Sequence, residues 1–150
     1  MSMPILNYTT CWKTRLFPLL LLSLACSAPR QMPPAAITTA SGLIYEIVMP
    51  GSGPIAQTGE MALIHETTRL GDGTLIVDTW AMNHPIRFLL GGKQVIDGVD
   101  EVVTGMRVGE RRKVVVPPHL SKRTSYPENG AFGPQDTLHY DITLLQTSKP

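Results

Sequence analysis

Cysteine is almost missing from this sequence, and the two that it has, Cys11 and Cys26, both lie near the N-terminus. From residue 27 onward there is none, which excludes a disulfide framework, a thiolate metal site and a catalytic thiol from that part of the chain. The four histidines do not have the spacing of metal ligands. The sequence therefore predicts no metal and no cofactor.

An excess of charge is also missing, because 13 Lys and Arg stand against 12 Asp and Glu. Without Lys13 and Arg15 the balance becomes 11 against 12. Domains that bind nucleic acid usually carry a basic face, so no nucleic-acid partner is expected. The one basic run, Arg111-Arg112-Lys113, is interpreted as the solvated end of a strand.

No apolar run is long enough to span a bilayer, which takes about 20 residues. The longest, residues 16–25, follows Lys13 and Arg15, and this order is typical of an export signal. We therefore expect residues 1–25 to be a signal peptide. A buried N-terminal helix is the alternative interpretation.

Leu22-Ser23-Leu24-Ala25-Cys26 resembles a bacterial lipobox, which would make Cys26 the site of lipid attachment. Several acyl chains on one residue anchor a protein stably to a membrane. Ordinary cleavage near residues 26–28 is the alternative. Residues 26–40 are rich in Ser, Ala, Pro and Thr, which favours a flexible tether. The expected location is the periplasm, with the anchor in the outer membrane because Ser27 follows the cysteine.

From residue 41 the pattern changes to short strand-like runs separated by Gly and Pro. Strands are predicted at residues 43–48, 61–70, 74–77, 85–90, 112–116 and 137–145. A single helix is predicted at residues 97–103, with Asp97 as its N-cap. The expected class is α+β, with a curved antiparallel β-sheet of five to six strands wrapped around one short α-helix. One domain, residues 41–147, and a monomer are expected.

Two motifs stand together in the second half of the chain. Val95-Ile96-Asp97-Gly98 opens the predicted helix, and a glycine turn within residues 105–109 leads into a strand that ends in Pro117-Pro118. With Ser41-Gly42-Leu43 and Asp72-Gly73-Thr74, they make residues 41–147 resemble FKBP-type peptidyl-prolyl cis-trans isomerases. The resemblance implies an FKBP-like fold that acts on proline-containing polypeptides.

Prolyl isomerisation breaks no covalent bond. Its barrier comes from the resonance of the amide, about 18–20 kcal/mol for a peptide bond. A dry apolar pocket favours the twisted transition state over the planar amide, so shape and desolvation supply the catalysis. The family's pocket implies catalytic roles for Asp78, for the backbone N–H of Ile96 and for Tyr140, although Tyr140 is also consistent with plain core packing.

The other pocket positions depart from the family's aromatic pattern. The resemblance puts Val99 where the family has Trp, Glu66 where it has Tyr, and Lys122 where it has the loop Tyr. One extra residue lets either Val77 or Ile76 take the position of an aromatic. The predicted substrate-binding residues are Glu66, Val77, Ile86, Val95, Val99, Lys122 and Phe132.

Aromatic residues are scarce, since only six follow residue 40, namely Tyr45, Trp80, Phe88, Tyr126, Phe132 and Tyr140. A full aromatic cage is therefore not expected. We expect Trp80 to pack into the space above Val99, with an exposed binding anchor as the alternative. Arg87 or Lys122 is expected to neutralise Glu66 if Glu66 points inward. Two functions remain: an isomerase weakened by its degenerate pocket, and a non-catalytic binding or chaperone module.

Overall fold

The computed structural model describes residues 35–123, 126 and 132–150, all of which belong to the unit Pro33–Pro150. The expected signal peptide, Cys26 and most of the expected tether lie outside the described residues. The elements are β1 (Ile37–Thr38), β2 (Ile44–Met49), β3 (Met61–Leu70), β4 (Leu75–Asp78), β5 (Ile86–Leu89), α1 (Asp97–Val103), β6 (Arg111–Val116), the 3₁₀ helix η1 (Pro118–Leu120) and β7 (Leu138–Ser148).

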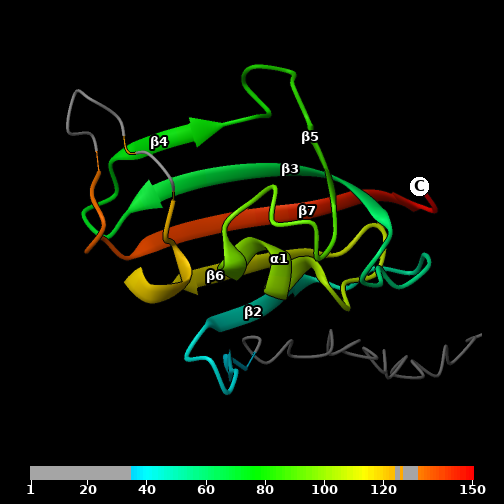
Figure 1. The fold of residues 1–150 in the computed structure, drawn as a ribbon, viewed down its shortest axis with the longest axis horizontal. Coiled ribbons are helices and arrows are strands. Elements are labelled where there is room, and N and C mark those ends of the chain that lie inside the picture. Colours follow the sequence, from blue (N-terminus) through cyan, green and yellow to red (C-terminus); the bar gives the residue numbers. More distant parts are fainter. Residues whose placement is uncertain (1–34, 124–125, 127–131) are drawn as a thin grey trace, which may run out of the picture. The chain divides into compact units, whose positions relative to one another are not determined.

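The seven strands form one antiparallel sheet in the order β1-β2-β6-β7-β3-β4, and β5 also pairs with β3. The long strands β3 and β7 run side by side through the centre and curve together (Figure 1). The α+β class and the curved antiparallel sheet with one short helix are confirmed. The strand beyond the six expected is β1, whose residues fall within the stretch expected to be a tether.

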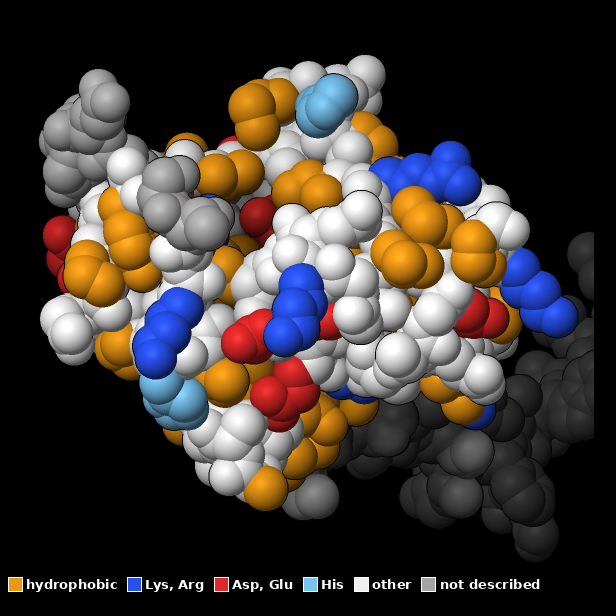
Figure 2. Space-filling view, viewed as in Figure 1, with side chains coloured by type: hydrophobic (Ala, Val, Ile, Leu, Met, Phe, Trp, Pro, Cys, Tyr) orange, Lys and Arg blue, Asp and Glu red, His pale blue; other side chains and the backbone are white. Residues whose placement is uncertain are grey.

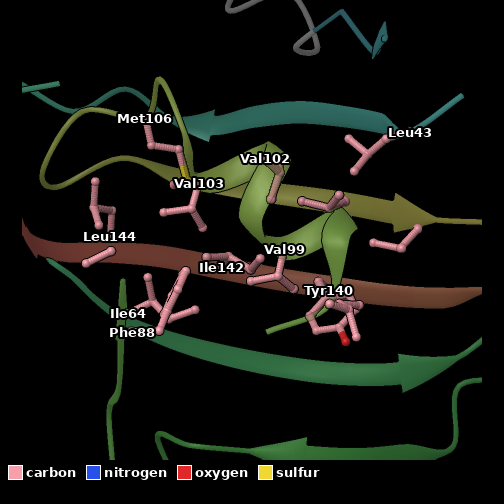
Figure 3. Packing of buried hydrophobic residues seen from close by; sticks show 14 of the residues in the cluster. Leu43, Ile64, Phe88, Val99, Val102, Val103, Met106, Tyr140, Ile142 and Leu144 are labelled. Carbon is pink, nitrogen blue, oxygen red and sulfur yellow. The ribbon is translucent and has the colours of Figure 1, made fainter. Parts of the chain in front are cut away.

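Strand β7 shows why the helix lies where it does. Its residues alternate between buried and less buried, and Leu138, Tyr140, Ile142 and Leu144 all point to one face. That alternation follows from the two-residue period of a strand. We call the face that α1 covers the inner face and the opposite one the outer face. Val99, Val102 and Val103 of α1 pack on the inner face (Figure 3).

Gly98 fixes how closely α1 approaches the sheet. A Cβ atom at this position would lie 2.5 Å from Cγ1 of Val116 on β6. A side chain there would require the helix or the strand to move, so glycine is needed for the close contact. Because Ile96 and Val95 directly precede α1, this contact also places the start of the helix over the sheet.

Two local expectations were wrong. Asp97 is the first residue of α1, and Ile96 is the N-cap, which makes no side-chain capping hydrogen bond. The run from Arg111 to Lys113 is not simply solvated, because Arg112 is buried. Its Nε donates to Glu110, its Nη1 donates to the carbonyl of Val102, and its guanidinium lies 4.5 Å from the Tyr45 ring centroid. Arg112 thus joins β6 to α1.

In the described part of the chain, no helix has the length and apolar character needed to cross a bilayer.

Candidate functional site

The candidate site lies at one end of the inner face, where several of the expected pocket residues meet. Tyr140 on β7 and Val99 on α1 are both buried, and Figure 3 shows them close together. Phe132, before β7, and Ile96, before α1, are also buried in the same cluster. Seen from the side of α1, the surface shows a hollow with an acidic side chain at its bottom and hydrophobic side chains around it (Figure 2).

Tyr140 is the polar group of this cluster. Only 3% of its surface is exposed, and its hydroxyl oxygen accepts a hydrogen bond of 3.1 Å from Nη2 of Arg123. Burial, together with the negative charge of Glu66, raises the pKa of Tyr140 to about 12. The phenol therefore stays protonated at neutral pH and offers a hydroxyl rather than a charge.

Glu66 points inward. It lies on β3 between Ile64 and Thr68, both on the inner face, and only 8% of its surface is exposed. The hydroxyl of Thr68 donates to its carboxylate at 3.4 Å. Burial raises the pKa of Glu66 to about 7, and the nearby charge of Arg123 opposes that rise. The cation expected beside Glu66 was Arg87 or Lys122, but the one that influences its carboxylate is Arg123.

The start of α1 offers a free donor to the site. The backbone at Ile96 is extended, and its carbonyl accepts the N–H groups of Val99 and Asp100. Across residues 35–123, 126 and 132–150, no hydrogen bond is recorded for the N–H of Ile96. A substrate carbonyl at this position would satisfy the N–H.

The other apolar positions border the same region. Val95 and Ile86 are half-buried and pack against the core cluster. In the hairpin of β3 and β4, Val77 pairs with Thr68, and the pairing then shifts so that Leu75 faces Arg69. Ile76 is the residue left over by this shift, and it packs against the core. Val77 and Ile76, the two residues that could take the position of the family's aromatic, therefore both border the inner face.

Two predicted residues are not brought to this cluster. Asp78 pairs with Thr67, whose place in the alternation is on the outer face, and its Oδ1 accepts the N–H groups of Trp80 and Ala81. The structure therefore shows Asp78 ordering the turn after β4 rather than contacting Tyr140. Lys122 is exposed, and its neighbour Arg123 makes the contact with Tyr140 instead.

Trp80 does not fill the space above Val99, so the packing expectation was wrong. Its ring stacks on His65 with the centroids 3.9 Å apart, and 52% of its surface is exposed. His65 follows Ile64 on β3 and therefore points to the outer face. Its Nδ1 lies 2.9 Å from the hydroxyl of Thr79. The tryptophan thus covers a histidine on the other side of the sheet.

The outer face carries a separate cavity of about 700 Å³. Its lining includes Arg69, Asp78, Arg111, Lys113 and His139. Arg111 and Asp141 form a two-bond ion pair there, with both nitrogen–oxygen distances at 2.6 Å. Ile44, Val115 and Tyr140 also line this cavity, but the charged side chains around it keep it from matching the dry apolar pocket that prolyl isomerisation requires. No cluster suited to a metal ion occurs among residues 35–123, 126 and 132–150.

Sequence reasoning missed Arg123 and Thr68, the two residues that surround the polar groups of the site. Thr68 alternates with Glu66 and Ile64 along β3, so its inward direction was available from the two-residue period. Arg123 had no such signal, because it lies outside any strand and reaches Tyr140 through the length of its side chain.

Comparison with known proteins supports the same assignment. Residues 53–145 match the model of the FKBP-type peptidyl-prolyl cis-trans isomerase family. An FK506-binding protein from Streptomyces anulatus is 33% identical over 104 residues, which cover 69% of this chain and 84% of that protein.

Solved structures agree with the fold. FkpA from Escherichia coli has 27% sequence identity and a TM-score of 0.68, with coverage of 76% of this chain and 52% of that one. A peptidyl-prolyl cis-trans isomerase from Pseudomonas syringae pv. tomato has 22% identity and a TM-score of 0.67, and the match covers 78% of this chain and 84% of that one. The family match spans every predicted pocket residue from Glu66 to Tyr140. The chain therefore belongs to the FKBP-type peptidyl-prolyl cis-trans isomerase family.

Proposed function

We propose that this chain isomerises X-Pro bonds in proteins of the cell envelope, and that it does so slowly because its pocket is only partly apolar. The observation that carries the proposal is that Tyr140, Phe132 and Val99 lie beside the N–H of Ile96, which no acceptor among the described residues binds. These residues provide apolar walls and one fixed donor, which is what a reaction governed by shape and desolvation requires.

In the proposed mechanism the prolyl ring lies over Val99, between Phe132 and Tyr140. The N–H of Ile96 holds a carbonyl of the substrate and fixes the chain on one side of the bond. Rotation about the C–N bond reduces the charge separation of the planar amide, so an apolar environment stabilises the twisted state relative to the planar one. No proton transfer is needed, and the high pKa of Tyr140 is consistent with this because the phenol stays neutral.

Two features support slow turnover. Valine offers less surface than an aromatic ring below the prolyl group, and each contact worth about 1.4 kcal/mol in the transition state changes the rate tenfold. Glu66 places a carboxylate on the inner face next to Tyr140, and an ionised group there attracts water into a site that works by excluding it.

The location in the envelope rests on the sequence of the leader. The apolar run of residues 16–25 and the lipobox-like ending at Cys26 support export and lipid attachment. Labelling cells with a radioactive fatty acid tests this directly. We expect label on the wild-type chain and none on Cys26→Ser, with Cys11→Ser as the matched control. Equal labelling of both variants, or no labelling of the wild type, contradicts the lipid anchor.

NMR exchange spectroscopy on short X-Pro peptides tests the activity. We expect the full chain to accelerate cis/trans exchange above the uncatalysed rate, and Tyr140→Ala to lower that acceleration about tenfold or more. His139→Ala is the control, because His139 is adjacent on β7 but exposed on the outer face. A folded wild-type chain that leaves exchange at the uncatalysed rate contradicts the activity.

A second candidate, a binding or chaperone module, is favoured by one specific observation. Trp80 and Met82 lie between β4 and β5 with 52% and 60% of their surfaces exposed, which places two large apolar side chains close together in sequence where a partner could contact them. Under this alternative, Trp80→Ser weakens the binding of an unfolded test protein without changing peptide exchange. Unchanged binding by Trp80→Ser contradicts it.

A further inference from the structure

Arg123 is an exposed residue whose side chain nevertheless reaches the pocket. Its Nη2 donates to the hydroxyl of Tyr140 at 3.1 Å, and its guanidinium carbon lies 5.0 Å from the centroid of the Phe132 ring. One contact is a hydrogen bond and the other a cation–π interaction. Together they hold a positive charge at the edge of the pocket, against two of the residues that would enclose a prolyl ring.

The described residues use little of the hydrogen-bonding capacity of this guanidinium. It carries five N–H donors in a planar fork that matches a carboxylate, and within the described part of the chain only the bond to Tyr140 is recorded. The two ion pairs in that part of the chain are Arg111–Asp141 and Arg112–Glu110, so none of the described carboxylates lies within pairing distance of Arg123. Because its orientation is already fixed by two contacts, binding a further carboxylate costs little additional side-chain entropy.

The charge of Arg123 acts on the carboxylate of Glu66, and Glu66 is itself held in an unfavourable place. It is buried, and its Thr68 bond of 3.4 Å is long for an O–H···O hydrogen bond. Among the described residues, Arg112 and Glu110 are also buried, and they pair with each other. When Glu66 is protonated, Arg123 has no ion-pair partner among the described residues, and its field is available to a ligand.

Resting on the proposed function, we propose that Arg123 is the specificity-determining residue of this pocket and that it binds the carboxylate of an acidic residue adjacent to the substrate proline. The guanidinium lies near enough to the Phe132 ring for a neighbouring side chain of a bound peptide to reach it. A lysine or arginine in the same place of the peptide meets the guanidinium and is disfavoured by like charge. The neutral Gln has the shape of Glu without its charge, so a Glu/Gln pair isolates the electrostatic part of the preference.

The test uses four peptides that differ only before proline, with Glu, Gln, Leu or Lys, and a second set varied after proline. At pH 6, we expect the kcat/KM of the full chain to be several-fold to about tenfold higher for the Glu peptide than for the Gln peptide in one of the two sets. The Lys peptide should have the lowest kcat/KM of that set. Arg123→Gln should bring the Glu/Gln ratio to about one, and Arg123→Glu should make Lys the preferred residue. Lys122→Gln is the matched control, because it removes a neighbouring exposed charge and should leave the ratio unchanged.

A wild-type ratio near one in both sets overturns the proposal, as does a ratio that survives Arg123→Gln or disappears in Lys122→Gln. If the wild-type chain catalyses no exchange at all, the proposed function fails but this inference is still tested by binding. Peptide titrations followed by the NMR shifts of Tyr140 and Phe132 should then show tighter binding of Glu than of Gln, and loss of that difference in Arg123→Gln. Equal binding of the two peptides overturns the proposal in that case as well.

Discussion

The two ends of the inner face are built from the same strands but differ in character. At one end Ala62, Ile64, Phe88 and Leu144 are fully buried and apolar. The other end lies a few residues further along β3 and β7. There the hydroxyl of Tyr140 accepts from Arg123, and the buried carboxylate of Glu66 accepts from Thr68. The first arrangement stabilises the domain, while the second holds two buried groups, Glu66 and Tyr140, whose pKa values burial has raised. Groups with shifted pKa values are typical of sites that bind a ligand.

If the apolar end carries the stability, truncating its largest side chain should have the greatest effect. Phe88 on β5 is 1% exposed, and Phe88→Ala should lower the free energy of unfolding by about 3–5 kcal/mol, as removing a buried aromatic usually does. Phe132→Ala at the polar end should lower the free energy of unfolding by less, about 1–2 kcal/mol. Urea denaturation at pH 7 measures both. A larger loss for Phe132→Ala would mean that the two ends do not differ as described.

The polar end should be destabilised by its own carboxylate when pH rises. The folded protein holds the proton of Glu66 more tightly than the unfolded chain does, because burial raises its pKa from 4.5 to about 7. The contribution of Glu66 protonation to the free energy of unfolding is thus fully present below pH 4.5 and is lost as the pH rises towards about 7. Since each unit of pKa corresponds to about 1.4 kcal/mol, up to about 3 kcal/mol is lost over this range.

Glu66→Gln should remove that pH dependence. We expect the variant to match the wild type near pH 4 and to exceed it by up to about 3 kcal/mol at pH 8, measured by urea denaturation. Glu46→Gln on β2 is the control, because Glu46 faces Lys113 across the strand pair away from this site. A Glu66→Gln variant that is less stable than the wild type at pH 8 would show that the carboxylate is favourably paired when ionised.

The bond between Arg123 and Tyr140 should have the smallest effect. Tyr140→Phe removes the hydroxyl that accepts from Arg123, and a net hydrogen bond contributes about 1 kcal/mol. We expect a loss of about that size for Tyr140→Phe, and only the smaller loss of the contact with Phe132 when Arg123→Gln is added. A double-mutant cycle measures this coupling. Fully additive losses would mean that the two side chains do not interact in solution.

The alternation of apolar residues was enough to predict most of the fold. Leu138, Ile142 and Leu144 repeat every second residue, and this period predicted both the strand and its buried face. Strand β1 was missed because two residues give no period. The inward direction of Glu66 was also within reach of the sequence, since it alternates with Ile64 in β3.

The partners of individual side chains could not be predicted in the same way. The burial of Arg112 depends on the carbonyl of Val102 in α1, and the exposure of Trp80 depends on His65 on the outer face. Arg123, rather than Lys122, reaches Tyr140 because of the path of the chain after η1. These contacts join segments that are distant in sequence or lack a period, so local patterns carry no information about them.

NMR shift mapping of the full chain with an X-Pro peptide tests whether substrate binds at the polar end of the inner face. We expect the signals of the Ile96 backbone N–H and of the Tyr140 and Phe132 rings to shift together as peptide is added, while those of His139 and Asp141 on the outer face remain unchanged. Shifts concentrated on the outer-face cavity, with Ile96 and Tyr140 unaffected, would contradict it.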